Sequence, residues 1–269
     1  QFDDLFASAQ KHKPVLMVAV NTMYNRMMQH PAFKASYFES IRISLAGGEK
    51  VQGETKQQWK LKTGKNLYEA YGLTETTAML TCNYLDERNT TNCVGVPLSN
   101  TQIKITDENG NTISNTHTAG VIWAKGPQVT SRYYNNTQAN AELFNDGWSN
   151  TGDIGEWETG GFLRILDRAK DMIAVSGIKV YPAEVDAVLM EVAGVLDCAC
   201  LGIKDEHTGE KIVAYIVSSP PFKEEDLIAH CQNKLAAYKI PKQFIAIDSI
   251  PKSAIGKTSR HLLKQITHS

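Results

Sequence analysis

A short run of the chain combines an aromatic ring, a glycine and two oxygen ligands: Tyr71-Gly72-Leu73-Thr74-Glu75-Thr76. The Thr74 hydroxyl and the Glu75 carboxylate are hard oxygen ligands of the kind that Mg²⁺ prefers, often together with phosphate oxygens. A lone Thr-Glu pair can also begin a helix, because Thr is a good N-cap and Glu favours the first turn. Taken alone, the pair favours a plain cap, and only the context of the whole run can reverse that interpretation.

Three further short motifs follow in order: Thr151-Gly152-Asp153, Arg168-Ala169-Lys170-Asp171 and Gly256-Lys257. Each could occur by chance, and an isolated Asp beside Gly is usually a solvated turn residue. A carboxylate at Asp153 could nevertheless accept hydrogen bonds from two neighbouring hydroxyls. The compact ammonium of Lys257, on a flexible stem, suits transient neutralisation of negative charge. Order and spacing therefore carry more information than any single motif.

The most specific stretch lies between Asp146 and Arg168, where Asp-Gly-Trp-Ser-Asn-Thr-Gly-Asp-Ile-Gly precedes Gly-Phe-Leu-Arg-Ile-Leu-Asp-Arg. With the other motifs it closely resembles the acyl-adenylate-forming ligases, and among them the fatty acyl-CoA synthetases, over essentially the whole chain. The resemblance implies two steps: a carboxylate and ATP give acyl-adenylate and pyrophosphate, and coenzyme A then displaces AMP to form a thioester. Relatives commonly carry Leu-His where this chain has Ser149-Asn150, which we interpret as tuning near the site.

The resemblance also implies a role for individual residues. In the first step a weak nucleophile attacks a phosphate, so catalysis must come from positioning and from cations. Tyr71 is expected to stack on adenine and Asp153, assisted by Arg168, to bind the ribose. The implied catalytic residues are Lys257, Thr74 and Glu75, with Thr74 and Glu75 also binding Mg²⁺. The implied nucleotide-binding residues are Gly47, Gly48, Glu49, Tyr71, Gly72, Thr74, Asp153 and Arg168.

The second step is expected to need a rotation of the last third of the chain about a hinge at Lys170. Lys257 then leaves, and Ser176 and Gly177 approach to open a path for the thiol of coenzyme A. The acyl pocket implied by the resemblance is lined by Asn21, Leu45, Ala46 and Leu73, and the Leu45-Ala46 pair is bulkier than in many relatives.

Composition limits the partners of the chain. Of 269 residues, 42% are apolar and 21% charged, and 28 Lys and Arg face 29 Asp and Glu, so no strong field favours nucleic acid or an anionic membrane. Small-molecule partners are expected. The five cysteines lack the spacing of a zinc site or a disulfide framework, which fits a reducing cytoplasm, and Cys198 and Cys200 are predicted to be buried on one strand face. We expect the seven histidines to be surface or helix residues without a catalytic role.

Apolar patterning predicts a fold of mixed α/β and α+β type in three parts. Residues 1–94 alternate strands (14–20, 41–45) with helices (22–30, 51–63), as in part of an α/β layered large domain. Residues 95–168 predict a β-rich, barrel-like subdomain with a hairpin turn at 107–111. Residues 169–269 predict a mobile α+β domain with strands at 172–175, 178–181, 196–203 and 211–217. Its two helices carry apolar faces at Val185, Val188, Leu189 and Val192, and at Leu227, Ile228, Cys231 and Leu235.

We find no Ser/Thr/Gly-rich loop ending in Lys-Gly, the segment that holds the outer phosphates in enzymes of this type. Since the chain opens at Gln1 inside a predicted helix, we expect the C-terminal half of a longer enzyme, inactive alone. Two alternatives stay open: another branch, an aryl-CoA or acyl-AMP ligase, or a short protein that binds nucleotide or acyl groups without turnover. Absence of an insertion near Lys170 argues against an acyl-AMP ligase. For the complete enzyme we expect a cytoplasmic location, with peripheral association at the inner face of the membrane and homodimer formation left open.

Overall fold

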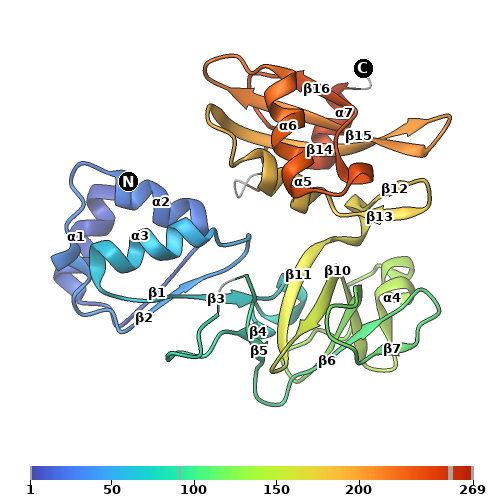
Figure 1. Cartoon of the computed structure of the whole chain (residues 1–269). Helices are drawn as coiled ribbons and strands as arrows, with labels where there is room; N and C mark the ends of the chain where they lie inside the picture. The colour runs from blue at the N-terminus through green and yellow to red at the C-terminus, as the bar shows by residue number, and fades with distance from the viewer. Residues whose placement is uncertain (1, 91, 254–256, 268–269) are drawn as a thin grey trace. The chain divides into compact units, whose positions relative to one another are not determined.

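The computed structural model describes residues 2–90, 92–253 and 257–267. The chain forms two compact units: Gln1–Thr151 with Gly155–Ile165, and Gly152–Ile154 with Leu166–Ser269. Three sheets and several helices give the mixed α/β and α+β architecture that the sequence predicts (Figure 1). The domain limits at residues 94 and 168 stay predictions. Among the described residues, no helix combines the length and the apolar character needed to cross a membrane.

The first sheet has the order β1-β2-β3-β4-β5. Its strands are β1 (Leu16–Ala19), β2 (Ile43–Ala46), β3 (Leu67–Tyr71), β4 (Thr81–Cys82) and β5 (Val96–Pro97). The helices are α1 (Phe2–His12), α2 (Asn21–Gln29) and α3 (Gly53–Thr63), with a 3₁₀ turn η1 (Ala35–Phe38). These helices pack on the first strands (Figure 1) around a fully buried Tyr24, Met27 and Trp59. Both helices predicted between the strands are thus confirmed.

Parallel pairing of β2 and β3 fixes where the site motifs lie. Ser44 pairs with Leu67 and Ala46 with Glu69, so the carboxyl ends of both strands meet at one edge of the sheet. The motif residues Gly47 and Gly72 come directly after these ends. Ligand-binding loops of α/β sheets gather at this edge. Two predicted nucleotide loops, 25 residues apart in sequence, are therefore neighbours.

The β-rich part has the order β11-β10-β8-β6-β7, with β9 beside β10. Its strands are β6 (Gln102–Thr106), β7 (Thr112–Ile113), β8 (Gly120–Lys125), β9 (Phe144–Asn145), β10 (Trp148–Glu158) and β11 (Phe162–Arg168), and α4 spans Thr137–Leu143. The predicted hairpin is confirmed: Ile105 pairs with Ile113, and the Asp107 carboxylate accepts hydrogen bonds from the backbone N–H groups of Asn109 and Asn111. Leu163 of β11 exchanges backbone hydrogen bonds with Val94 and Gly95, just before β5.

The sequence did not indicate β10, although it is eleven residues long. Its first half, Ser149 to Asp153, has the polar and glycine-rich composition of a turn, and a solvated turn was the alternative weighed for Asp153. That alternative is wrong. β10 lies between β8 and β11, so its backbone is paired on both sides, and the polar residues Ser149, Thr151 and Asp153 of its first half are buried.

The second unit is built on a sheet of order β13-β12-β15-β14, with β16 beside β15. Its strands are β12 (Ile173–Val175), β13 (Ile178–Val180), β14 (Val195–Asp205), β15 (Gly209–Ser218) and β16 (Gln243–Ala246). Its helices are α5 (Pro182–Leu189), α6 (Glu224–Lys234) and α7 (Arg260–Thr267). Cys198 and Cys200 lie on one buried face with α5 and α6, as predicted, whereas Leu263 of α7 packs on the opposite face.

A buried ion pair ties α3 to β3. Lys56 Nζ lies 2.9 Å from Glu69 Oε2, and both side chains are less than a tenth exposed. The pair is embedded in backbone: Glu69 Oε1 accepts from Val51 N and Lys56 Nζ donates to the Thr90 carbonyl. A buried carboxylate of this kind is tolerated only while its counter-charge and hydrogen bonds remain.

We expect Lys56→Met to lower the free energy of unfolding by about 3–5 kcal/mol, because it leaves the buried Glu69 carboxylate without a cation. Urea denaturation measures the change. Lys60→Met, one turn further along α3 at an exposed position, is the matched control and should have little effect. Equal stability of the two variants would contradict the role of the pair.

Candidate functional site

The loop after β2 carries the predicted residues Gly47, Gly48 and Glu49, and side chains hold it to α2. The Glu49 carboxylate accepts a hydrogen bond from Thr22 N (2.8 Å), and the Asn21 amide oxygen accepts one from Gln52 N (3.1 Å). A Cβ on Gly47 would lie 2.8 Å from the Ala70 carbonyl oxygen, so this loop and the end of β3 are in close contact. The structure thus brings the predicted nucleotide loop beside Asn21, whose buried amide helps to shape it.

The loop after β3 turns back tightly on itself. A Cβ on Gly72 would lie 2.4 Å from the Ala78 carbonyl oxygen, a contact that only glycine permits. Ala78 N donates to the Leu73 carbonyl, and the buried Thr76 hydroxyl both accepts from Leu73 N (2.9 Å) and donates to the Leu73 carbonyl (3.0 Å). The short 3₁₀ turn η2 (Thr74–Thr76) therefore presents Thr74 on the surface.

A segment from another part of the chain holds Glu75. Tyr133 Oη donates to Glu75 Oε1 at 2.5 Å, and Thr130 N donates to the Glu75 carbonyl at 2.7 Å. The Thr74 hydroxyl and the Glu75 carboxylate are a donor set that fits Mg²⁺. A hydrogen bond to a ligating carboxylate is how neighbouring groups orient a metal ligand. Sequence reasoning missed Tyr133, because a tyrosine in a polar loop carries no motif.

The residues predicted for the acyl pocket are mostly buried. Leu45 and Ala46 lie in the sheet, and Ala46 packs with the core under α2 and α3. Tyr24 Oη donates to the Leu45 carbonyl (3.1 Å), and burial raises the pKa of Tyr24. Leu73 is half-buried. Their role toward an acyl group stays a prediction.

In the second unit, Asp153 and Arg168 lie side by side. Asp153 Oδ1 is 2.9 Å from Arg168 Nη1, with the Asp153 side chain 6% and the Arg168 side chain 45% exposed. β10 and the end of β11 position the two groups. A buried carboxylate aligned by a guanidinium suits recognition of two adjacent hydroxyls. The predicted ribose partners are therefore in contact, while their ligand stays a prediction.

The other predicted residues of the second unit are at its surface. Lys170 is exposed in the 3₁₀ turn η3 (Ala169–Asp171). Ser176 and Gly177 form the exposed two-residue turn between β12 and β13, with φ of 51° and 78°. Lys257 is exposed on a hairpin, and its motif partner Gly256 lies outside the described residues.

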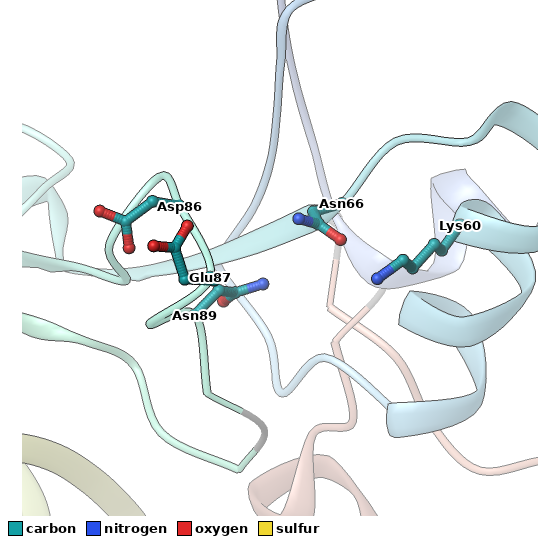
Figure 2. Close-up of a pocket in the computed structure, with 5 residues that line it drawn as sticks. All are labelled: Lys60, Asn66, Asp86, Glu87 and Asn89. Carbon is teal, nitrogen blue, oxygen red and sulfur yellow. The ribbon is translucent and has the colours of Figure 1, made fainter.

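One open hollow of about 400 Å³ lies away from these residues. Figure 2 shows its lining: Lys60, Asn66, Asp86, Glu87 and Asn89. Its charges are mixed, and hydrogen bonds from Arg88 lower the pKa of Asp86. None of its residues belongs to the predicted site. We therefore do not assign it to the same chemistry.

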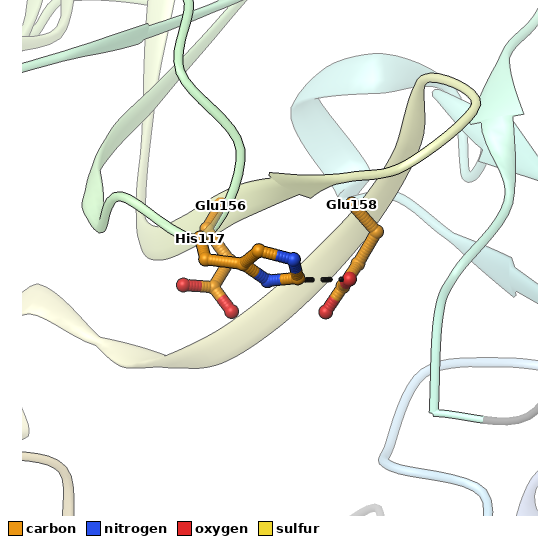
Figure 3. A group of neighbouring side chains, drawn as sticks. All are labelled: His117, Glu156 and Glu158. Carbon is orange, nitrogen blue, oxygen red and sulfur yellow. Dashed lines mark ion pairs between the residues drawn. The ribbon is translucent and has the colours of Figure 1, made fainter.

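A second cluster joins His117, Glu156 and Glu158 (Figure 3), whose ligand atoms lie within 4.8 Å of one another. His117 Nδ1 is 3.3 Å from Glu158 Oε2. However, Arg164 Nε donates to Glu156 Oε1 (2.7 Å) and is 3.0 Å from Glu158 Oε1. A guanidinium therefore already compensates both carboxylates, and the cluster is an ion-pair network. The sequence did not foresee this partner of His117.

Comparison with known proteins identifies the family. Residues 1–134 match the AMP-binding enzyme family, and residues 184–257 match the AMP-binding enzyme C-terminal domain. The chain belongs to the AMP-binding enzyme family. Both parts of the family pattern are thus present, in the order that the motifs require.

Curated relatives include CoA ligases of two kinds. The chain is 37% identical to a long-chain-fatty-acid–CoA ligase of Yersinia pestis over 92% of this chain and 44% of that protein. It is 34% identical to the Bacillus subtilis enzyme of the same name, over 96% of this chain and 47% of that protein. A 2-succinylbenzoate–CoA ligase of Bacillus licheniformis is 36% identical over 97% of this chain and 54% of that protein. The chain spans about half the length of these relatives.

Solved structures of several enzymes match the fold of this chain. ATP-bound MatB from Rhodopseudomonas palustris matches with a TM-score of 0.90 and 28% identity, over 99% of this chain and 53% of that one. A second match is the o-succinylbenzoate CoA synthetase MenE from Bacillus subtilis in complex with its acyl-adenylate intermediate. Its TM-score is 0.88 and its identity 32%, over 98% of this chain and 54% of that one. A further MenE structure holds ATP and a magnesium ion. The fold is therefore that of adenylate-forming enzymes.

In the complete enzyme, we expect Asp153→Asn to weaken AMP binding on the order of 10- to 100-fold, because charge-assisted hydrogen bonds contribute roughly 1.5–3 kcal/mol. Titration calorimetry measures the dissociation constant. Asp146→Asn, an exposed aspartate before the same strand, is the control. Unchanged AMP affinity in Asp153→Asn would remove this residue from the nucleotide site.

Proposed function

We propose that this chain is the C-terminal part of an ATP-dependent fatty acid–CoA ligase. The buried Asp153 carboxylate aligned by Arg168 carries the proposal, because it forms a ready acceptor for ribose hydroxyls in the motif context of that family. Similarity to long-chain-fatty-acid–CoA ligases supports fatty acids as the acid substrate. The chain alone is expected to be inactive, since its sequence lacks the loop for the outer phosphates.

In the first step, a carboxylate oxygen of the acid attacks the α-phosphorus of ATP, and the bond to the leaving pyrophosphate breaks. Tyr71 offers an aromatic face to adenine, and Asp153 accepts from the ribose. The exposed ammonium of Lys257 neutralises charge between the carboxylate and the α-phosphate. Thr74 and Glu75, with Tyr133 orienting the carboxylate, would hold Mg²⁺, which supplies further positive charge to the phosphates when bound.

In the second step, the thiol of coenzyme A attacks the acyl carbonyl, a C–S bond forms, the thiol proton is lost, and AMP leaves. We place the hinge for this step at the exposed Lys170. The turn at Ser176 and Gly177 stands out from the sheet between β12 and β13, so it can approach a ligand without moving the core. Peripheral membrane association and homodimer formation remain predictions from the resemblance.

A second candidate is a CoA ligase for an aromatic acid. It is favoured by the 2-succinylbenzoate–CoA ligase relative, which is 36% identical over 97% of the chain. ATP-dependent thioester formation by the complete enzyme, measured across fatty acids of several lengths and aromatic acids, separates the two. We expect fatty acids to give the highest kcat/KM. A preference for aromatic acids would establish the second candidate, and no turnover of any acid would refute both.

We expect Lys257→Ala in the complete enzyme to slow acyl-adenylate formation by about 10²–10³, the usual cost of losing one preorganised charge-stabilising group. ATP–pyrophosphate exchange measures this step. Thioester formation from supplied acyl-adenylate should be largely retained, because the attack on the α-phosphorus, which Lys257 assists, is already complete in that intermediate. An equal loss in both assays would show that the role assigned to Lys257 is wrong.

A further inference from the structure

The backbone of Lys257 is held in a short hairpin. Ser253 N donates to the Lys257 carbonyl (2.7 Å), and Lys257 N donates to Ser253 Oγ (3.2 Å). One step outward Lys252 pairs with Thr258, and Ser259 N donates to the Pro251 carbonyl. The hairpin thus fixes the Cα of Lys257, although the side chain reaches into solvent. The contacts that hold this hairpin in place therefore determine which positions the Lys257 ammonium can reach.

Each strand of this hairpin is anchored by a cation. On the incoming strand, Lys252 Nζ lies 2.6 Å from Asp197 Oδ2 at the surface. On the outgoing strand the chain passes directly into α7, whose first residue is Arg260. The Arg260 side chain is 14% exposed and that of Lys252 is 39% exposed, so Arg260 is the less exposed of the two anchors. Buried charge pairs are screened less by solvent than surface pairs and hold their geometry more strictly.

Arg260 reaches four groups on four elements of the unit: α5, β14, β11 and η3. Its guanidinium forms an ion pair with Asp186 of α5, and its Nε donates to the Cys200 carbonyl of β14 (3.2 Å). It also lies 4.0 Å from Asp167 Oδ1 and 3.8 Å from Asp171 Oδ2. The last two residues stand on either side of Lys170. Arg260 therefore touches both flanks of the predicted hinge.

The carboxylates around Arg260 are themselves part of the framework. Asp167 Oδ1 accepts from Arg168 N, and its Oδ2 accepts from Ala183 N at the start of α5. Asp186 Oδ1 accepts from Cys200 N. Burial raises the pKa of Asp186 to about 6, an effect that the positive charge of Arg260 opposes. One guanidinium faces three carboxylates here. A planar guanidinium with several N–H donors can bind partners in different directions, which a lysine ammonium on its single stem does less well.

We propose that Arg260 is a positioning residue for acyl-adenylate formation: it fixes the base of the Lys257 hairpin to α5, β14 and the residues on either side of Lys170, and so holds the Lys257 backbone in one position within the second unit. The inference rests on the proposed function, because it assigns Arg260 a task that acts through Lys257. A small displacement of a catalytic group costs much rate, whereas a step that does not use Lys257 should tolerate it.

The first test uses the complete enzyme with Arg260→Lys and Arg260→Met. The lysine keeps a positive charge beside the buried aspartates and so guards against loss of folding, but it cannot span the four partners. Both variants should slow ATP–pyrophosphate exchange, Arg260→Met by about 10²-fold. Thioester formation from supplied acyl-adenylate should change little. Lys234→Met is the matched control, since it removes an exposed ion pair with Glu191 that touches neither hairpin nor hinge. A loss shared equally by both half-reactions would overturn the proposal.

The second test asks whether Arg260 acts through Lys257. In a Lys257→Ala background, Arg260→Met should cause almost no further loss of exchange activity, because the group it positions is already absent. Independent effects would instead multiply, to within about twofold. A multiplied loss would show that Arg260 supports the unit in general, and the proposal would fail.

A third measurement does not depend on the acid. Hydrogen–deuterium exchange of the peptide covering residues 251–259 should rise in Arg260→Lys and not in Lys234→Met, because the backbone bonds at Ser253, Lys257 and Ser259 would open more often. Unchanged exchange in Arg260→Lys would overturn the positioning role. If the unaltered enzyme forms no acyl-adenylate with any acid, the proposed function fails, and this measurement still decides whether Arg260 orders the hairpin.

Discussion

The first unit depends on one buried carboxylate, that of Glu69. Its side chain accepts the backbone N–H of Val51, its own carbonyl accepts that of Asn83, and Lys56 supplies the counter-charge. These bonds fix the loop that contains Gly47 in position relative to β3, the strand that ends at Tyr71. A hydrophobic residue could fill the same volume and keep the backbone bond to Asn83, but it could not bind Val51 N or the Lys56 ammonium. Charge inside this core is therefore used for geometry more than for net stability.

The second unit has a similar arrangement with opposite charges, in which the central group is a cation and its partners are carboxylates. There a largely covered cation, Arg260, joins carboxylates that already bind backbone N–H groups. Glu69 and Arg260 are not themselves predicted to meet a ligand, in contrast to the buried Asp153. Exposed groups such as Thr74 and Lys257 can then meet a ligand, while their backbones remain fixed. This division matches the need of adenylate formation for positioned charge.

Much of this could be predicted from the sequence, for identifiable reasons. Helix α2 follows from apolar periodicity, and the hairpin at Asp107 follows from turn chemistry, which is local. β10 could not be predicted, because its polar residues resemble a loop until strands on both sides satisfy its backbone. Tyr133 and Arg260 were missed for a related reason: their partners lie 58 and 74 residues away, and no local pattern records such contacts.

The tight loop that begins at Gly72 has a consequence for enzyme engineering. Its backbone has no room for a methyl group, since the Ala78 carbonyl occupies that space, so the loop offers few routes for redesign. Leu73 is the exception, because Thr76 and Ala78 bind its backbone while its side chain is half-buried. Side chains of different volume can be tried there without shifting Thr74 and Glu75. A library confined to this one codon would test whether Leu73 contacts the acid, as the resemblance implies.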